Sequence, residues 1–175
     1  MHKDYWRLKP PAKTQNPIPS MITTFSVGFF DGASQDRSGG CGCVLWLSDT
    51  HSFSCWMGVG IGTNNFAELV DVWMLLYLLQ TLSLEECQIF GDSRVVIDCL
   101  SSKQSLSALH LQHWCGQIGD LRASMRTINF SHVYRCFNMK VDFLSKRGLG
   151  CPMGLLFYDK YMSGSLVKEG SRKLF

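Results

Sequence analysis

The chain has 175 residues, of which 46% are hydrophobic and 18% charged, and its formal net charge is +3 at pH 7. This composition predicts one folded domain with a sizeable core and excludes a largely disordered chain. It also excludes a strongly basic protein, so charge alone does not indicate a nucleic-acid partner.

The first part of the chain predicts a linker followed by three strands. Residues 1–20 are rich in proline and predict a linker or N-terminal extension. Three segments rich in β-formers follow, and the short turn-like stretches between them predict antiparallel hairpins. We expect these strands at residues 23–30, 39–47 and 52–59, with a turn at Asp31-Gly32.

From Asn64 onward the pattern becomes helical. Asn64 is a good helix N-cap, and the following residues as far as Leu82 contain no glycine or proline, which predicts a long buried helix. A short apolar strand then ends at Gly91-Asp92-Ser93, and Ser93 can cap a second helix. The remaining expected elements are a strand at 87–90, a helix at 106–123, a strand at 127–134 and a helix at 139–146.

The order β-β-β-α-β-α-α-β-α predicts an α/β domain over residues 21–149. Three antiparallel strands followed by strand–helix crossovers imply a mixed five-stranded sheet, with three antiparallel strands and then two parallel ones, flanked by helices. Residues 150–175 have weak periodicity, and we expect them to form a C-terminal tail of unknown role.

Eight cysteines raise the possibility of disulfides or a zinc site, but the chain has no Cys-x-x-Cys pair. The start of the chain is polar rather than a signal peptide. The longest apolar run, about residues 69–79, is interrupted by Asp71 and is too short to span a bilayer. We therefore expect free thiols in a monomeric intracellular protein, cytoplasmic or nuclear, with no membrane partner.

Four acids lie where separate elements could converge. Asp31 and Asp92 end the first and fourth strands, and ligand sites in α/β sheets favour such strand ends. Glu68 lies in the first turn of the long helix, and Asp142 lies near the start of the last helix. Clustered carboxylates resist ionising together unless a cation neutralises them, so convergence would predict a metal site. Any one acid alone has an ordinary explanation, because a helix dipole favours acids near its N-terminus.

Several motifs occur in a set order. They are FDGAS at 30–34, GIGTNNFAE at 60–68, GDS at 91–93, FSHVYR at 130–135, Asn138 and Asp142. This ordered set resembles the signature of type 1 ribonuclease H over about residues 25–148. Its particular form resembles the domains attached to plant retroelement reverse transcriptases and their domesticated relatives.

The resemblance implies a ribonuclease H-like fold and metal-dependent endonucleolytic hydrolysis of the RNA strand of RNA–DNA hybrids. It implies that Asp31, Glu68, Asp92 and Asp142 bind two Mg²⁺ ions, for which Mn²⁺ could substitute. His132 would assist proton transfer or product release, which suits its near-neutral titration.

The resemblance also implies how the chain contacts its partners. Asn64 and Asn65 would contact the minor groove of the hybrid, and Thr63 would contact a phosphate. Asn138 would serve substrate binding by steadying the loop before the last acid. The expected partners are an RNA–DNA hybrid and an upstream reverse transcriptase domain.

Two departures from the family bear on activity. The interval between Asp92 and Asp142 is shorter than in the bacterial form and lacks its basic handle, so substrate holding is expected to be reduced. Arg94 stands where cellular enzymes often have glutamine. The main alternative is a non-catalytic nucleic-acid-binding module on the same fold, which the loss of any one acid would have favoured. A 3′ exonuclease is disfavoured, because such enzymes typically carry Asp-x-Glu where this chain has Asp31 followed by Gly32-Ala33.

Overall fold

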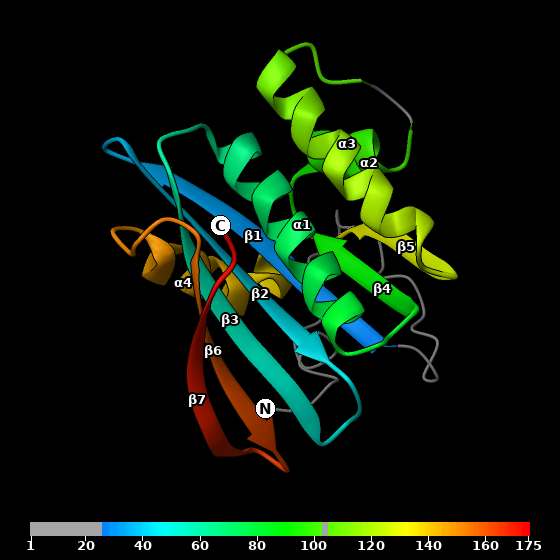
Figure 1. Ribbon diagram of the computed structural model, residues 1–175, viewed down its shortest axis with the longest axis vertical. Helices are drawn as coiled ribbons and strands as arrows, with labels where there is room; N and C mark the ends of the chain where they lie inside the picture. Colours follow the sequence, from blue (N-terminus) through cyan, green and yellow to red (C-terminus); the bar gives the residue numbers. More distant parts are fainter. Residues whose placement is uncertain (1–25, 103–104) are drawn as a thin grey trace.

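The computed structural model describes residues 26–102 and 105–175 of the chain. The predicted linker, residues 1–20, lies outside these ranges. Within them the strands form one seven-stranded sheet in the order β5-β4-β1-β2-β3-β6-β7, with helices on both faces (Figure 1). The predicted mixed sheet flanked by helices is confirmed, but the prediction of five strands was two too few.

The central part of the sheet has the predicted topology. β1 pairs with β2 in antiparallel orientation and with β4 in parallel orientation, and β2–β3 and β4–β5 continue these two patterns outward. These strands are β1 (Ser26–Gln35), β2 (Ser38–Trp46), β3 (His51–Gly60), β4 (Glu86–Gly91) and β5 (Thr127–His132).

The predicted turn at Asp31-Gly32 was wrong, because β1 continues through both residues to Gln35. The chain instead turns at Asp36-Arg37, whose φ angles of 47° and 65° are both positive. Two-residue hairpins need this conformation, since it matches the twist of the flanking strands. Asp31 therefore lies inside β1, directly after the part of the strand that pairs with both β2 and β4.

The two additional strands come from the segment for which the sequence indicated no role. β6 (Leu155–Met162) pairs with β3, and β7 (Ser165–Lys173) pairs with β6, so this hairpin extends the sheet beyond β3 (Figure 1). β7 forms an edge whose side chains are almost all exposed. Without a buried face it lacks the alternation of apolar and polar residues by which a strand is recognised in a sequence.

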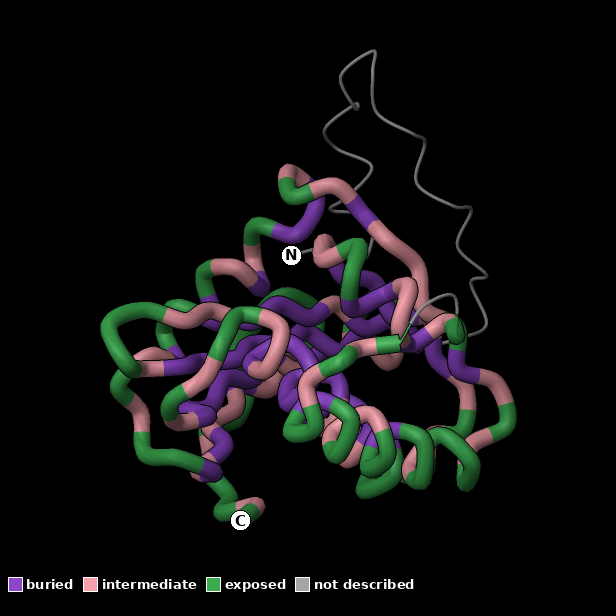
Figure 2. Tube along the Cα trace, turned by 90° about the horizontal axis from the view of Figure 1, so that it is seen from above, coloured by how far each residue is buried: buried purple, intermediate pink, exposed green. Residues whose placement is uncertain are grey.

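The helices cover the sheet in two groups, each with its own apolar core. α1 packs on β1 and β2 and contacts α3, whereas α4 packs on the opposite face against β1, β2 and β3. Buried residues gather in the centre of the molecule, purple in Figure 2. The helices are α1 (Asn64–Thr81), α2 (Arg94–Leu100), α3 (Leu109–Ala123) and α4 (Met139–Gly148), with a short 3-10 helix at Arg135–Phe137.

Alternation along β2 separates the two cores. Cys41, Cys43 and Leu45 belong to the core beneath α1, whereas Val44 and Trp46 belong to the core beneath α4. None of the eight cysteines, all of which lie within the described ranges, forms a disulfide, as predicted. Within the described ranges, no helix is long and apolar enough to cross a membrane.

Glycine on β2 allows α4 to lie directly on the sheet. A Cβ atom at Gly42 would lie 2.5 Å from both Leu144 Cβ and Ser145 N, and one at Gly40 would lie 2.3 Å from Ser145 O. Side chains at these two positions would push α4 outward. This close approach brings Asp142 of α4 towards Asp31 on the neighbouring strand.

Candidate active site

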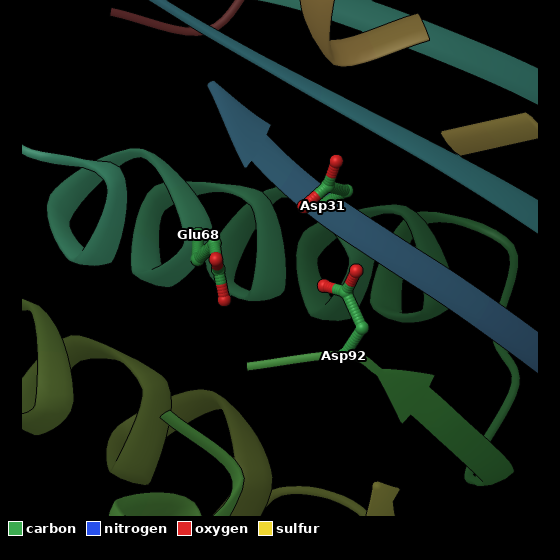
Figure 3. A group of neighbouring side chains, drawn as sticks. All are labelled: Asp31, Glu68 and Asp92. Atoms are coloured by element: carbon green, nitrogen blue, oxygen red, sulfur yellow. The ribbon is translucent and has the colours of Figure 1, made fainter. Parts of the chain in front are cut away.

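Three carboxylates converge at the end of the parallel pairing between β1 and β4. The register of that pairing ends at Phe30 opposite Gly91, so Asp31 and Asp92 each follow the last paired residue. Glu68 projects towards them from α1, just beyond the first helical turn rather than within it as predicted. Figure 3 shows the three side chains arising from these separate elements, and one carboxylate oxygen from each lies within 4.8 Å of the others.

The fourth predicted acid reaches the same cleft but not the same cluster. Asp142 lines a cleft of about 500 Å³ together with Asp31, Glu68 and Asp92. Its carboxylate is engaged by two cations, with Arg135 Nη2 3.3 Å from Oδ1 and Lys146 Nζ 2.8 Å from Oδ2. Lys146 lies one helical turn after Asp142, which is a spacing visible in the sequence.

Burial makes the cluster electrostatically costly in the absence of a cation. Burial, together with the smaller effects of the charges of Asp92 and Asp142, raises the pKa of Asp31 to about 7. Burial, together with the smaller effects of the charges of Asp31 and Asp92, raises the pKa of Glu68 to about 9. Burial also raises the pKa of Asp92. For Asp142, burial is outweighed by hydrogen bonds from Lys146 and Arg135, which leave its pKa lowered.

The donor set fits a hard divalent cation. Glu68 Oε2 is buried and has no hydrogen-bond partner among the described residues. Buried polar atoms rarely stay unpaired, and such an atom calls for an explanation such as a bound ion. Three carboxylates beside an open cleft offer the oxygen ligands that Mg²⁺ prefers while leaving room for water and a phosphate.

Hydrogen bonds from the opposite face of the sheet hold Asp31 in place. Asn138 Nδ2 donates to Phe30 O at 2.9 Å, and Ser145 Oγ donates to Asp31 Oδ2 at 3.3 Å. Asn138 is only 1% exposed, and its side chain also hydrogen-bonds the Asp92 carboxylate, so it contacts the elements that carry two of the clustered acids. Sequence reasoning missed Ser145, whose signal is its position one turn after Asp142 on α4.

His132 lies beside the cluster at the end of β5. Its Nε2 is 3.1 Å from the backbone oxygen of Asp92, and its Nδ1 is 3.2 Å from Arg94 Nη2. Because an arginine can only donate, Nδ1 accepts and Nε2–H donates, which specifies a neutral imidazole. Burial lowers the pKa of His132, and the nearby charge of Arg94 lowers it further. Arg94, predicted only as a departure from glutamine, therefore orients the predicted proton-transfer group.

The predicted substrate-contacting residues lie around the start of α1. Thr63 rather than Asn64 is the N-cap, and its Oγ1 accepts a hydrogen bond from Phe66 N at 3.2 Å. Asn64 is exposed and Asn65 is half-buried, and both line the cleft beside Glu68. A helix N-terminus attracts phosphate groups, so this edge of the cleft is suited to a nucleic-acid backbone.

We expect Mg²⁺ to stabilise the protein strongly at pH 8 and little at pH 5. The folded pKa values of Asp31 and Glu68, about 7 and 9, exceed the ordinary values of 3.8 and 4.5. The unfolded chain therefore releases these protons first, and the free energy of unfolding of metal-free protein falls as pH rises from about 4 to 9. Bound Mg²⁺ offsets this loss, by roughly 3–6 °C in Tm at a tenfold excess over Kd.

Thermal unfolding followed by circular dichroism at both pH values, with and without Mg²⁺, measures the effect. In the metal-free protein, Asp31→Asn should flatten the decline below about pH 7, because it removes the carboxylate whose pKa is about 7. An equal rise in Tm at pH 5 and pH 8, or none at pH 8, would contradict the assignment of the metal to these carboxylates.

Comparison with known proteins identifies the family. A family profile described as reverse transcriptase-like matches residues 29–148. No curated protein matches the chain.

Solved structures show the same fold. RNase H1 from the halophilic archaeon Halobacterium salinarum NRC-1 is 21% identical, with a TM-score of 0.64 over 70% of this chain and 96% of that one. The N-terminal RNase H domain of Rv2228c from Mycobacterium tuberculosis is 25% identical, with a TM-score of 0.64 over 70% of this chain and 91% of that one. LC11-RNase H1, isolated from compost and solved in complex with an RNA/DNA hybrid, is 20% identical, with a TM-score of 0.63 over 71% and 96% of the two chains.

The matched segment contains the three clustered carboxylates, Asp142 and His132. It spans most of the chain, and its fold agrees with that of the solved structures. The chain therefore belongs to the reverse transcriptase-like family and has the fold of type 1 ribonuclease H.

Proposed function

We propose that this protein hydrolyses the RNA strand of RNA–DNA hybrids endonucleolytically, as the ribonuclease H domain of a plant-type retroelement or a domesticated relative. The observation that carries the proposal is the convergence of Asp31, Glu68 and Asp92 within 4.8 Å, inside the segment that matches the family. Asp142 lines the same cleft and completes the proposed set of ligands for two Mg²⁺ ions, with Mn²⁺ as a substitute.

Each side chain has a defined part in the proposed reaction. When bound, Mg²⁺ supplies Lewis-acid stabilisation of the phosphodiester and a water of lowered pKa. The four carboxylates would hold the cations, and Arg135 and Lys146, which now pair with Asp142, would supply positive charge beside a phosphate backbone in the cleft. The neutral His132 would accept a proton at Nδ1, with Arg94 giving up its hydrogen bond to that nitrogen, and would pass it to solvent or to the leaving group.

Recognition of the hybrid is assigned to the start of α1. Asn64 and Asn65 offer amide groups along the cleft, where they can read 2′-hydroxyls and minor-groove shape without reading bases. Thr63, whose side chain caps α1, keeps the helix N-terminus directed at a phosphate. An attached reverse transcriptase domain would add the affinity that a basic handle provides in bacterial enzymes.

The alternative is a non-catalytic nucleic-acid-binding module. The ion pairs of Asp142 with Arg135 and Lys146 are the observation that favours it, because a carboxylate held by two cations is less available to a metal. The raised pKa values of Asp31 and Glu68 argue against it. A buried cluster of acids destabilises the fold, and strongly shifted pKa values are typical of catalytic sites.

A set of four duplexes of one sequence tests the proposal: an RNA–DNA hybrid, a DNA duplex, an RNA duplex, and the hybrid with 2′-methoxy groups on the RNA. With Mg²⁺, we expect cleavage of the RNA strand of the hybrid alone, because only that substrate combines free 2′-hydroxyls with the hybrid shape. Strand-specific end labels on denaturing gels measure the products.

Binding to the same duplexes, measured by fluorescence anisotropy, provides the control. Tight binding to the hybrid without cleavage, at an excess of protein over substrate, would support the non-catalytic module. Equal cleavage of the DNA duplex would contradict recognition through 2′-hydroxyls.

A further inference from the structure

The middle of α1 contains a completely buried acid outside the metal cluster. Asp71 is 0% exposed and is flanked along the helix by the buried apolar residues Val70 and Val72. It lies one helical turn after Glu68, so the two carboxylates project from the same side of α1. Burying a carboxylate costs free energy unless hydrogen bonds compensate for the lost water, so its partners are informative.

The Asp71 carboxylate accepts hydrogen bonds from two backbone amides of the central strands, and the Cys41 thiol of β2 lies beside it. Oδ2 accepts hydrogen bonds from Asp31 N at 3.0 Å and from Gly42 N at 3.1 Å. Asp31 and Gly42 stand directly opposite each other in the antiparallel pairing of β1 with β2. One oxygen atom of α1 therefore joins the two strands at the residue that supplies a proposed metal ligand.

The contact of α1 with β1 is closest at the same place. A Cβ atom at Gly32 would lie 2.3 Å from Glu68 N and 2.6 Å from the carbonyl carbon of Ala67. The backbone of β1 thus touches the backbone of α1 between Asp31 and Glu68. Asp71 fixes this approach by hydrogen bonding, whereas packing alone would permit the helix to slide along the strand.

We propose that Asp71 is a positioning residue of the metal site, which holds the helix carrying Glu68 at a fixed distance from the strand carrying Asp31 and thereby sets the affinity for the metal. This inference rests on the proposed metal-dependent function. Asp71 is completely buried and is not among the residues that line the cleft, so it would act through the two ligands whose elements it joins.

Substitutions at Asp71 in the full chain distinguish the effect of its hydrogen bonds from the effects of its charge and of its side-chain volume. Asp71→Asn keeps an oxygen that can accept from both amides, whereas Asp71→Leu fills a similar volume without an acceptor. Leu79→Ala is the matched control, because Leu79 is 0% exposed on the same helix and remote from Asp31. It should lower stability without disturbing the metal ligands.

Metal affinity provides a measurement that a purely structural role would not change. We expect Asp71→Leu to weaken Mn²⁺ binding, titrated by electron paramagnetic resonance without substrate, by about 10-fold or more. The Mg²⁺ concentration for half-maximal hybrid cleavage should rise by the same factor. Asp71→Asn should stay within about threefold of the wild type, and Leu79→Ala should bind metal as the wild type does.

Unchanged metal affinity in folded Asp71→Leu would overturn the inference, as would an equal loss in Asp71→Asn or in Leu79→Ala. If Asp71→Leu does not fold, Asp71→Ser replaces it, because a serine hydroxyl is too short to reach both amides and should also weaken metal binding. Failure of the proposed function is distinguishable, since the wild type would then bind no metal and cleave no hybrid.

Discussion

Replacing Asp92 with asparagine is expected to reduce the rate of hybrid cleavage by on the order of a thousandfold. The substitution keeps the size of the side chain but removes one of three carboxylates whose oxygens lie within 4.8 Å of one another. A bound divalent cation contributes several kcal/mol of charge stabilisation in a phosphodiester transition state, and each 1.4 kcal/mol corresponds to about a factor of ten. Asparagine is a weak ligand for Mg²⁺, so most of that stabilisation should be lost.

The loss should arise from metal binding and not from unfolding. Asp92 carries a pKa raised by burial, so a neutral amide relieves a cost in the metal-free protein and Tm should be unchanged or higher. Single-turnover cleavage and thermal unfolding of Asp92→Asn, beside the wild type, separate the two effects. Asp120→Asn, an exposed acid on α3, is the matched control and should retain full activity. A variant at Asp92 that cleaves within tenfold of the wild type would rule out its role as a ligand.

The second large effect is expected at His132, where alanine should reduce kcat by about a hundredfold with little change in KM. Proton transfer by a positioned side chain contributes at least that much in typical cases. The ring is held by Arg94 and the backbone oxygen of Asp92 in a neutral form that can accept a proton. Steady-state cleavage of the hybrid as a function of substrate concentration gives both constants.

His113→Ala is the control for His132→Ala, because His113 lies exposed on α3. Its substitution should leave both constants unchanged. A rise in KM with kcat unchanged in His132→Ala would assign the histidine to substrate binding instead of proton transfer. A loss of activity restored by added imidazole would support the proton-transfer role directly.

The convergence of acids could be predicted because it depends on local signals. Asp31 and Asp92 each follow an apolar run, and residues that follow the paired parts of adjacent parallel strands lie at the same edge of the pairing. Glu68 lies close to a recognisable helix start, so its direction was also constrained. Each of these features is visible within a single segment of the sequence. Only the order of the strands in the sheet is needed to bring the three acids together.

The remaining features depend on contacts between distant segments. Asp71 interrupts an apolar run in the sequence, but only the packing of α1 against β1 and β2 shows which amides it accepts. The ion pair between Arg135 and Asp142 likewise requires the 3-10 helix to place Arg135 beside α4. The β6–β7 hairpin was missed because an exposed edge strand has no buried face to impose a pattern.

The most direct test of the metal-dependent nuclease is single-turnover cleavage of a hybrid whose RNA and DNA strands carry different labels. The protein is held in excess over substrate, so that weak binding does not hide the chemistry. With Mg²⁺, we predict internal cleavage of the RNA strand, an intact DNA strand, and complete arrest of the reaction on addition of a chelator. Cleavage that continues in chelator, or a bound hybrid that stays intact at saturating Mg²⁺, would contradict the assignment of catalysis to Asp31, Glu68, Asp92 and Asp142.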